Sequence, residues 1–157
     1  ALVGRALAQV RDLSNLLRPS VLDDLGLVAA LHALANDFST RTRIETDVVL
    51  TGATRRLAPD IEVVIYRVVQ EALTNIARHA HASRATVRLS LTDVHAALTV
   101  EDNGRGLSSH AGQDGGTHMG WLGMRERVTA VGGSLTIGAG EHGGVRLDAF
   151  IPTGVRA

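Results

Sequence analysis

The sequence predicts a two-layer α/β (α+β) sandwich, in which a mixed, mostly antiparallel sheet is covered on one face by helices. Helical and strand-like periodicities alternate along the chain in the order α-α-β-α-β-β-loop-α-β-β. The chain has 157 residues, of which 45% are hydrophobic, so it is long enough to bury one core. No apolar run approaches the ~18 residues that a transmembrane helix needs. These observations predict one globular unit.

The first part of the chain is predicted to be helical. Residues 1–17 have apolar positions at helical spacing, and Arg18-Pro19 ends this helix because the residue before a proline avoids the α region. A second helix is expected over residues 20–38. Residues 44–50 follow as a strand, which ends at a threonine and a glycine.

The middle of the chain predicts a long helix and a hairpin. Pro59 and Asp60 begin a helix expected over residues 60–79. Its apolar face consists of Ile61, Val64, Ile65, Val68, Val69, Ala72, Leu73 and Ile76. Two strands, over residues 86–91 and 96–101, are joined by four residues and predict a β-hairpin.

The remaining third is rich in glycine. Residues 103–119 show no periodicity and predict a long loop, of the kind that forms lids and binding sites in compact domains. A helix is expected over residues 120–131, where two glycines end it. Two final strands are expected over residues 134–137 and 145–151.

Composition limits the functional classes. Sixteen basic and sixteen acidic residues cancel, so the chain has no overall positive field of the kind that indicates direct nucleic-acid binding. The absence of cysteine excludes disulfides, thiolate metal sites and a cysteine nucleophile. The sequence begins in mid-helix without a methionine, and we expect it to be a piece of a longer protein.

The first motif with chemical meaning is Val-Glu-Asp-Asn-Gly-Arg-Gly-Leu over residues 100–107. Asp102 follows a predicted strand, where its carboxylate can accept a hydrogen bond from an exocyclic amine in a pocket. Gly104 and Gly106 allow a tight turn and let the backbone approach a flat ligand. Alone, the motif is more typical of an ordinary turn than of a binding site, because Asp-Asn-Gly is a common turn sequence.

The second motif is a polar stripe on the helix predicted over residues 60–79. Glu71, Asn75 and His79 are four residues apart and lie on one helical face. A solvated surface explains this spacing too, but these polar groups lie among valine, alanine, leucine and isoleucine. Glutamate and asparagine supply the oxygen ligands that suit Mg²⁺. Arg78 and His79 can reach phosphate oxygens.

The third motif is Gly-Trp-Leu-Gly-Met-Arg-Glu-Arg-Val over residues 120–128. Gly120 and Gly123 are expected at the beginning of a helix, after the flexible loop. Free backbone N–H groups there would face an anion. An ordinary helix start explains these glycines less well, because serine, threonine and aspartate are commoner caps.

The three motifs, in this order and at these separations, resemble the ATP-binding catalytic domain of sensor histidine kinases, whose Bergerat fold is shared with gyrase B and MutL. The first and third motifs resemble its two glycine boxes, and the second resembles its N box. Glu-Ala-Leu-Thr-Asn-x-x-Arg-His-Ala (71–80) and Gly-Met-Arg-Glu-Arg (123–127) are similar to one subfamily. Its Leu-Arg-Pro lead-in also resembles residues 17–31. The resemblance covers residues 10–152.

The resemblance implies ATP and Mg²⁺ as cofactors. In this reading Asp102 accepts a hydrogen bond from the adenine 6-amino group and selects ATP over GTP. Gly104 and Gly106 shape the adenine pocket.

The same resemblance assigns the groups around the triphosphate. Asn75 holds Mg²⁺, and Glu71 is a second ligand or positions a water, so these two residues form the catalytic pair. The phosphates are approached by Arg78 and His79, and the lid over them hinges at Gly120 and Gly123.

The resemblance also implies a domain division and partners. Residues 1–40 are expected to be the end of a dimerisation helix and a linker helix, and residues 41–157 the catalytic domain. The expected partners are the protein's own dimerisation helices in a homodimer and a response regulator with a LuxR/NarL-type output domain. We expect no direct nucleic-acid contact and a cytoplasmic domain. The phosphoacceptor histidine is expected upstream, because His32 lacks the acidic neighbour found in the subfamily.

Two departures from the family pattern keep alternatives open. His118 and Val145 stand where the family usually has glycine and threonine. A degenerate ATP-binding fold used as a protein-interaction module is one alternative, although Glu71, Asn75 and Asp102 are all present. An anti-sigma-factor serine kinase is the other, and the Leu-Arg-Pro and Met-Arg-Glu-Arg segments argue against it.

Overall fold

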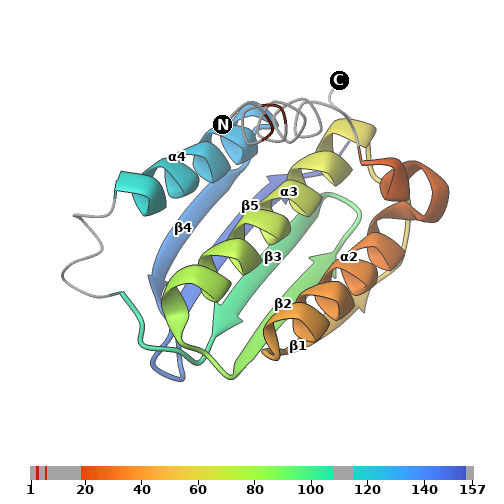
Figure 1. Cartoon of the computed structure of the whole chain (residues 1–157). Helices are drawn as coiled ribbons and strands as arrows, with labels where there is room; N and C mark the ends of the chain where they lie inside the picture. The colour runs from red at the N-terminus through yellow and green to blue at the C-terminus, as the bar shows by residue number, and fades with distance from the viewer. Residues whose placement is uncertain (1–2, 4–5, 7–18, 108–114, 155–157) are drawn as a thin grey trace.

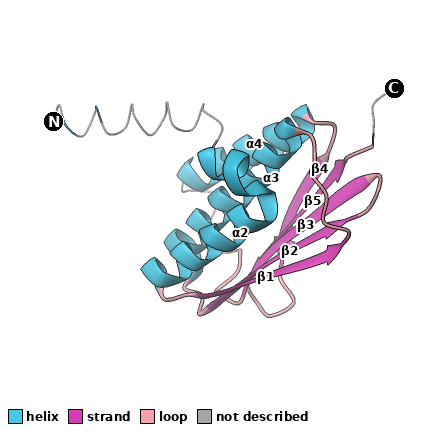
Figure 2. Ribbon diagram, turned by 90° about the vertical axis from the view of Figure 1, so that its right-hand side faces the viewer, coloured by secondary structure: helices cyan, strands magenta, loops and turns pink. Residues whose placement is uncertain are grey.

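The computed structural model describes residues 3, 6, 19–107 and 115–154; for residues 115–119 only the backbone is described. Figure 1 shows a single sheet with α2, α3 and α4 side by side across one face, and Figure 2 shows the two layers edge-on. The two-layer α/β sandwich predicted from the sequence is confirmed. The helix predicted over residues 1–17 lies almost wholly outside the described residues.

The sheet is mixed, as predicted, with the strand order β1-β2-β3-β5-β4. β1 (Glu45–Gly52) pairs in parallel with β2 (Arg84–Leu91). The other neighbours are antiparallel: β2 with β3 (His95–Asp102), β3 with β5 (Val145–Pro152), and β5 with β4 (Ser134–Ala139). The predicted hairpin over residues 86–101 is therefore confirmed, and each strand extends one or two residues beyond its predicted bounds at one or both ends, while β1 begins one residue later than predicted.

Side chains of β3 alternate between the two faces of the sheet. Leu98, Val100 and Asp102 point to the helix-covered face and are buried. Thr99 and Glu101 point to the opposite face. The consecutive carboxylates at the end of β3 thus lie on opposite sides of the sheet.

The helix α2 (Ser20–Thr42) extends past its predicted end and is kinked at Gly26, whose φ is 79°. Arg56 lies beside this kink, where its Nη2 donates to the carbonyl of Leu22 at 3.5 Å. The same guanidinium pairs with the buried carboxylate of Glu62 at 3.1 Å. This contact joins the first turn of α2 to the beginning of the next helix.

The central helix of the layer is α3 (Pro59–Asn75), which continues as the π-turn η1 (Ile76–Ala80). Its amphipathic face packs on the sheet, as the periodicity predicts. The shared core includes Leu31, Phe38, Ile65, Val68, Leu73, Val87, Leu89, Leu98, Met124, Val128 and Ile151. Within the described residues, no helix is long and apolar enough to cross a bilayer.

The third helix, α4 (Gly115–Ala130), begins five residues before the predicted start at residue 120. The predicted loop over residues 103–119 is therefore too long, and its residues 108–114 lie outside the described part. Glycine has a low helix propensity, which is why the Gly-rich segment predicts a loop. Packing of α4 on α3 and β4 outweighs that propensity.

Candidate functional site

Asp102 is the buried carboxylate at the centre of the site, with only 3% of the residue exposed. Its Oδ1 accepts a hydrogen bond from the Gly104 N–H at 2.7 Å, and its Oδ2 accepts one from the Val145 N–H at 3.3 Å. Burial raises the pKa of Asp102; these two hydrogen bonds lower it, the nearby charge of Glu101 raises it, and the net shift is upward. The carboxylate is thus held in a fixed orientation by two main-chain donors, one from the loop after β3 and one from the first residue of β5.

Gly104 and Gly106 occupy positions that no larger residue fits. A Cβ at Gly104 would lie 2.1 Å from the carbonyl oxygen of Ala80. Gly106 has a φ of 77°, and a Cβ there would lie 2.6 Å from the carbonyl oxygen of Gly143. The protein's own backbone therefore requires glycine at both positions, while their predicted role beside a flat ligand stays a prediction.

Glu71 and Asn75 lie one turn apart on α3, under the backbone of α4. A Cβ at Gly120 would lie 2.7 Å from Glu71 Oε1 and 3.8 Å from Asn75 Nδ2. Nδ2 of Asn75 is buried and makes no hydrogen bond. An unpartnered buried amide costs free energy, which is a reason to expect a ligand at this position.

Arg78 and His79 lie in the π-turn η1, which follows Asn75. The Arg78 side chain is exposed and His79 is half-buried. A π-turn is wound more widely than an α-helix, so His79 does not continue the predicted i, i+4 stripe. Arg105 holds this turn through its Nε, which donates to the carbonyl of His79 at 2.6 Å, and its N–H, which donates to Ala80 at 2.8 Å.

The structure corrects the place of Gly120 and Gly123. Both lie inside α4 rather than at its beginning, so their N–H groups are not the free donors that the sequence analysis predicts. Gly120 instead lets α4 approach Glu71 closely, and nothing lies within 4 Å of a Cβ at Gly123. The backbone of His118 lies in the same helix, and its side chain is outside the description.

A cleft of about 170 Å³ separates α3 from α4 next to Glu71. It is lined by Arg67, Gln70, Glu71, Gly120, Gly123, Met124 and Arg127. Burial and the nearby charge of Arg127 lower the pKa of Arg67, whose Nη1 donates to Gln70 at 2.8 Å. The cleft places a polar, cationic surface beside the Glu71 carboxylate.

Residues 60–155 match the protein family described as histidine kinase-, DNA gyrase B-, and HSP90-like ATPases. The chain belongs to this ATPase family. Membership implies an ATP-binding domain, as the three motifs predict. The matched residues include all three motifs. The first motif begins at the end of β3, and Glu71 and Asn75 of the second motif lie on α3.

Curated relatives and solved structures agree with this assignment. The sensor histidine kinase MctS of Rhizobium johnstonii is 43% identical over 148 residues, which cover 94% of this chain and 32% of the relative. The oxygen sensor histidine kinase NreB of Staphylococcus carnosus is 36% identical over 152 residues, covering 96% of this chain and 43% of the relative. The chain thus spans only 32% to 43% of the length of these proteins.

The histidine kinase domain of the blue-light activated histidine kinase EL346 from Erythrobacter litoralis superposes with a TM-score of 0.64 at 26% sequence identity. The match covers 81% of this chain and 61% of that chain. The fold class predicted from the sequence, the Bergerat ATP-binding fold, is therefore confirmed.

Sequence reasoning missed two groups that support Asp102. Gly144 is so close that a Cβ there would lie 2.4 Å from Asp102 Oδ1, and the Val145 N–H donates to Oδ2. In the sequence, Val145 is notable only as a departure from the family's threonine, whereas in the structure its main chain contributes to the site. The paired glycines at 143–144 were the available signal.

We expect Gly120→Ala and Gly123→Ala to differ in their effect on stability. Both gain about 1 kcal/mol of helix propensity. Gly120→Ala must also move the Glu71 carboxylate into a less favourable rotamer, which costs about 0.5–1.5 kcal/mol. Urea unfolding without nucleotide should therefore show Gly123→Ala to be the more stable variant. In a Glu71→Ala background the difference should vanish, and its persistence would contradict the contact.

Proposed function

We propose that this chain is the ATP-binding catalytic domain of a two-component sensor histidine kinase. It would transfer the γ-phosphate of ATP to a histidine on dimerisation helices that precede residues 1–40 of the chain. The observation that carries the proposal is the buried Asp102 carboxylate, held by two main-chain donors close to the π-turn that follows Asn75. The names of the similar proteins, sensor histidine kinases, support the reaction class.

Asp102 is proposed to recognise adenine. An ionised carboxylate only accepts hydrogen bonds, so it pairs with the exocyclic amine of adenine and disfavours the carbonyl oxygen of guanine. Gly104 and Gly106 would shape the adenine pocket, because neither places a side chain beside Asp102. These contacts account for a preference for ATP over GTP.

Asn75 and Glu71 are proposed to hold Mg²⁺ through their side-chain oxygens, because this cation prefers oxygen ligands and retains several waters. The residues fit the ion: Nδ2 of Asn75 is buried and unpartnered, and a rotated amide would present its oxygen at that position. Bound Mg²⁺ would supply charge neutralisation on the phosphates. Glu71 would also orient a water or the acceptor.

The phosphates are proposed to lie between α3 and α4. Arg78 and His79 would approach them from η1, because a guanidinium group and an imidazole ring N–H both donate hydrogen bonds to phosphate oxygens. The backbone of Gly120 now lies against Glu71, so we infer that the first turns of α4 move outward when phosphates enter. Gly120 and Gly123 would be the hinge of this lid.

The proposed partners are the protein's own dimerisation helices and a response regulator of the LuxR/NarL output class, in the cytoplasm. His32, exposed on α2, is not proposed as the acceptor. The division between residues 1–40 and 41–157 remains a proposal too. The two other functions, an interaction module and an anti-sigma-factor serine kinase, are outcomes of the test.

The test supplies the parent protein's dimerisation helices to this chain in trans, with γ-labelled ATP and Mg²⁺. We expect acid-labile, alkali-stable label on histidine with the wild type and none with Asn75→Ala. Asn36→Ala, an exposed asparagine of α2, is the matched control and should retain transfer. Label on serine would support the serine kinase, and ATP binding without transfer would support the interaction module.

The raised pKa of Asp102 predicts a pH dependence of ATP binding. Because its pKa lies above the ordinary 3.8, protonation on acidification begins at a higher pH than for an exposed aspartate. The protonated form loses acceptor capacity, so affinity should fall as the pH drops through this raised pKa and recover above it. Titrations with ADP should show this slope in the wild type. The slope should be absent from Asp102→Asn, which does not titrate, and an equal slope in both would contradict the assignment.

A further inference from the structure

Glu101 points to the sheet face opposite α2, α3 and α4, yet its side chain is only 7% exposed. A charged group is rarely buried unless it is paired or hydrogen-bonded. The turn between β4 and β5, residues 140–144, covers it. A Cβ at Gly140 would lie 3.0 Å from Glu101 Oε1.

The carboxylate of Glu101 holds the main chain of this turn. The Glu141 N–H donates to Oε1 at 2.7 Å, and the turn is closed by a hydrogen bond from the Gly140 N–H to the Gly144 carbonyl at 2.8 Å. Arg88 donates to Oε2 at 3.4 Å, but its side chain is 52% exposed. A long, solvated ion pair contributes little, so the bond to Glu141 is the stronger contact.

The opposite side of the same turn contacts Asp102. Gly144 lies against Oδ1, and the Val145 N–H donates to Oδ2 at 3.3 Å. The turn is therefore held between two consecutive carboxylates of β3, one on each face of the sheet.

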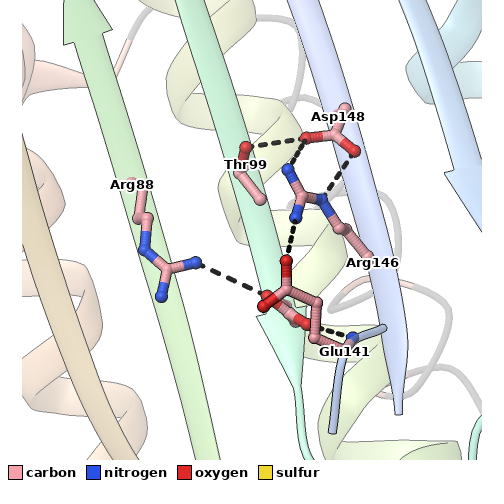
Figure 3. A network of polar contacts seen from close by, with 6 residues as sticks. Arg88, Thr99, Glu141, Arg146 and Asp148 are labelled. Atoms are coloured by element: carbon pink, nitrogen blue, oxygen red, sulfur yellow. Dashed lines mark hydrogen bonds and ion pairs between the residues drawn. The ribbon is translucent and has the colours of Figure 1, made fainter. Parts of the chain in front are cut away.

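A second set of contacts on the outer face is more exposed. Arg146 pairs with Asp148 at 2.9 Å, and Thr99 donates to Asp148 at 2.7 Å (Figure 3). Burial by itself raises the pKa of Asp148, but the bonds from Arg146 and Thr99 outweigh it and the pKa is lowered. Arg146 reaches the turn through the Glu141 side chain, at 3.5 Å, and that side chain is 72% exposed.

We propose that Glu101 is a positioning residue for nucleotide binding. By accepting the Glu141 N–H it keeps the β4–β5 turn in place, so that the Val145 N–H orients the Asp102 carboxylate toward adenine. Glu101 does not contact the nucleotide. The proposal rests on the proposed role of Asp102 in adenine recognition.

The test is a double-mutant cycle on ATP affinity. Glu101→Ala should weaken binding about fivefold, the effect of losing one hydrogen bond. Glu101→Gln keeps an acceptor oxygen and should stay within about twofold of the wild type, as should the control Arg88→Ala. In an Asp102→Asn background, Glu101→Ala should change nothing further. Equal weakening in both backgrounds, or no weakening by Glu101→Ala alone, would overturn the proposal.

A second measurement separates this inference from the proposed function. Amide hydrogen exchange of Val145 in the nucleotide-free chain should accelerate in Glu101→Ala and stay slow in Arg88→Ala. Unchanged exchange in Glu101→Ala would overturn the positioning role, whether or not ATP binds. If exchange accelerates in Glu101→Ala but the wild-type chain does not bind ATP, the structural role of Glu101 is supported and only the proposed function is rejected.

Discussion

Asp102→Asn is expected to weaken ATP binding at least tenfold, about 1.4 kcal/mol. In the wild type, both carboxylate oxygens accept main-chain N–H groups, from Gly104 and Val145. An asparagine has an NH₂ group in place of one of these two acceptor oxygens. The main-chain N–H that this NH₂ group faces loses its acceptor, and the amide rotates away from the repulsion between the two donors. The remaining oxygen is no longer presented to the adenine amine. An equilibrium titration with a fluorescent ATP analogue, with and without Mg²⁺, measures this loss.

The matched control for this variant is Asp93→Asn. Asp93 is an exposed aspartate in the hairpin turn that precedes β3, at the opposite end of the strand from Asp102. The two substitutions remove the same charge, and only the control should bind ATP as the wild type does. Thermal unfolding of both variants verifies that the fold is retained. Equal affinities in Asp102→Asn and the wild type would remove Asp102 from the adenine site.

The parts of the fold that the sequence predicts correctly are those with strong local periodicity. The apolar face of α3 follows the helical period, and the alternation in β2 and β3 follows the strand period. The start of α4 was predicted wrongly, because packing on α3 and β4 decides it and the local glycine content does not. The π-turn at Ile76–Ala80 is also a tertiary feature, held by Arg105 from the end of β3.

The site shows the same division between local and distant residues. Asp102, Gly104 and Gly106 form one short motif, so their chemistry can be deduced together. Val145 is 43 residues away in the sequence. It reaches Asp102 because β3 and β5 pair antiparallel, with Glu101 opposite Arg146. A single sequence does not specify that register, so the supporting role of the β4–β5 turn emerges only from the structure.

Gly104→Ala is expected to destabilise the chain by about 2–3 kcal/mol and to abolish measurable ATP binding. The new Cβ would lie 2.1 Å from the carbonyl oxygen and 2.7 Å from the carbonyl carbon of Ala80. Because both contacts are between backbone segments, the clash is relieved only if η1 moves away from the segment that follows β3. Separation breaks the 2.8 Å bond from the Arg105 N–H to Ala80 and displaces the Gly104 N–H from Asp102. Urea unfolding and ATP titration report the two effects.

Gly138→Ala makes this prediction specific to the contact. Gly138 lies in β4, and nothing lies within 4 Å of a Cβ built there. Both variants restrict the unfolded chain equally, which by itself stabilises by about 0.4–1 kcal/mol. Gly138→Ala should therefore be as stable as the wild type or slightly more so, and should bind ATP normally. The difference in free energy of unfolding between the two variants measures the cost of separating η1 from the segment that follows β3. If the two variants were equal in stability and in ATP affinity, this close approach would not hold the nucleotide site together.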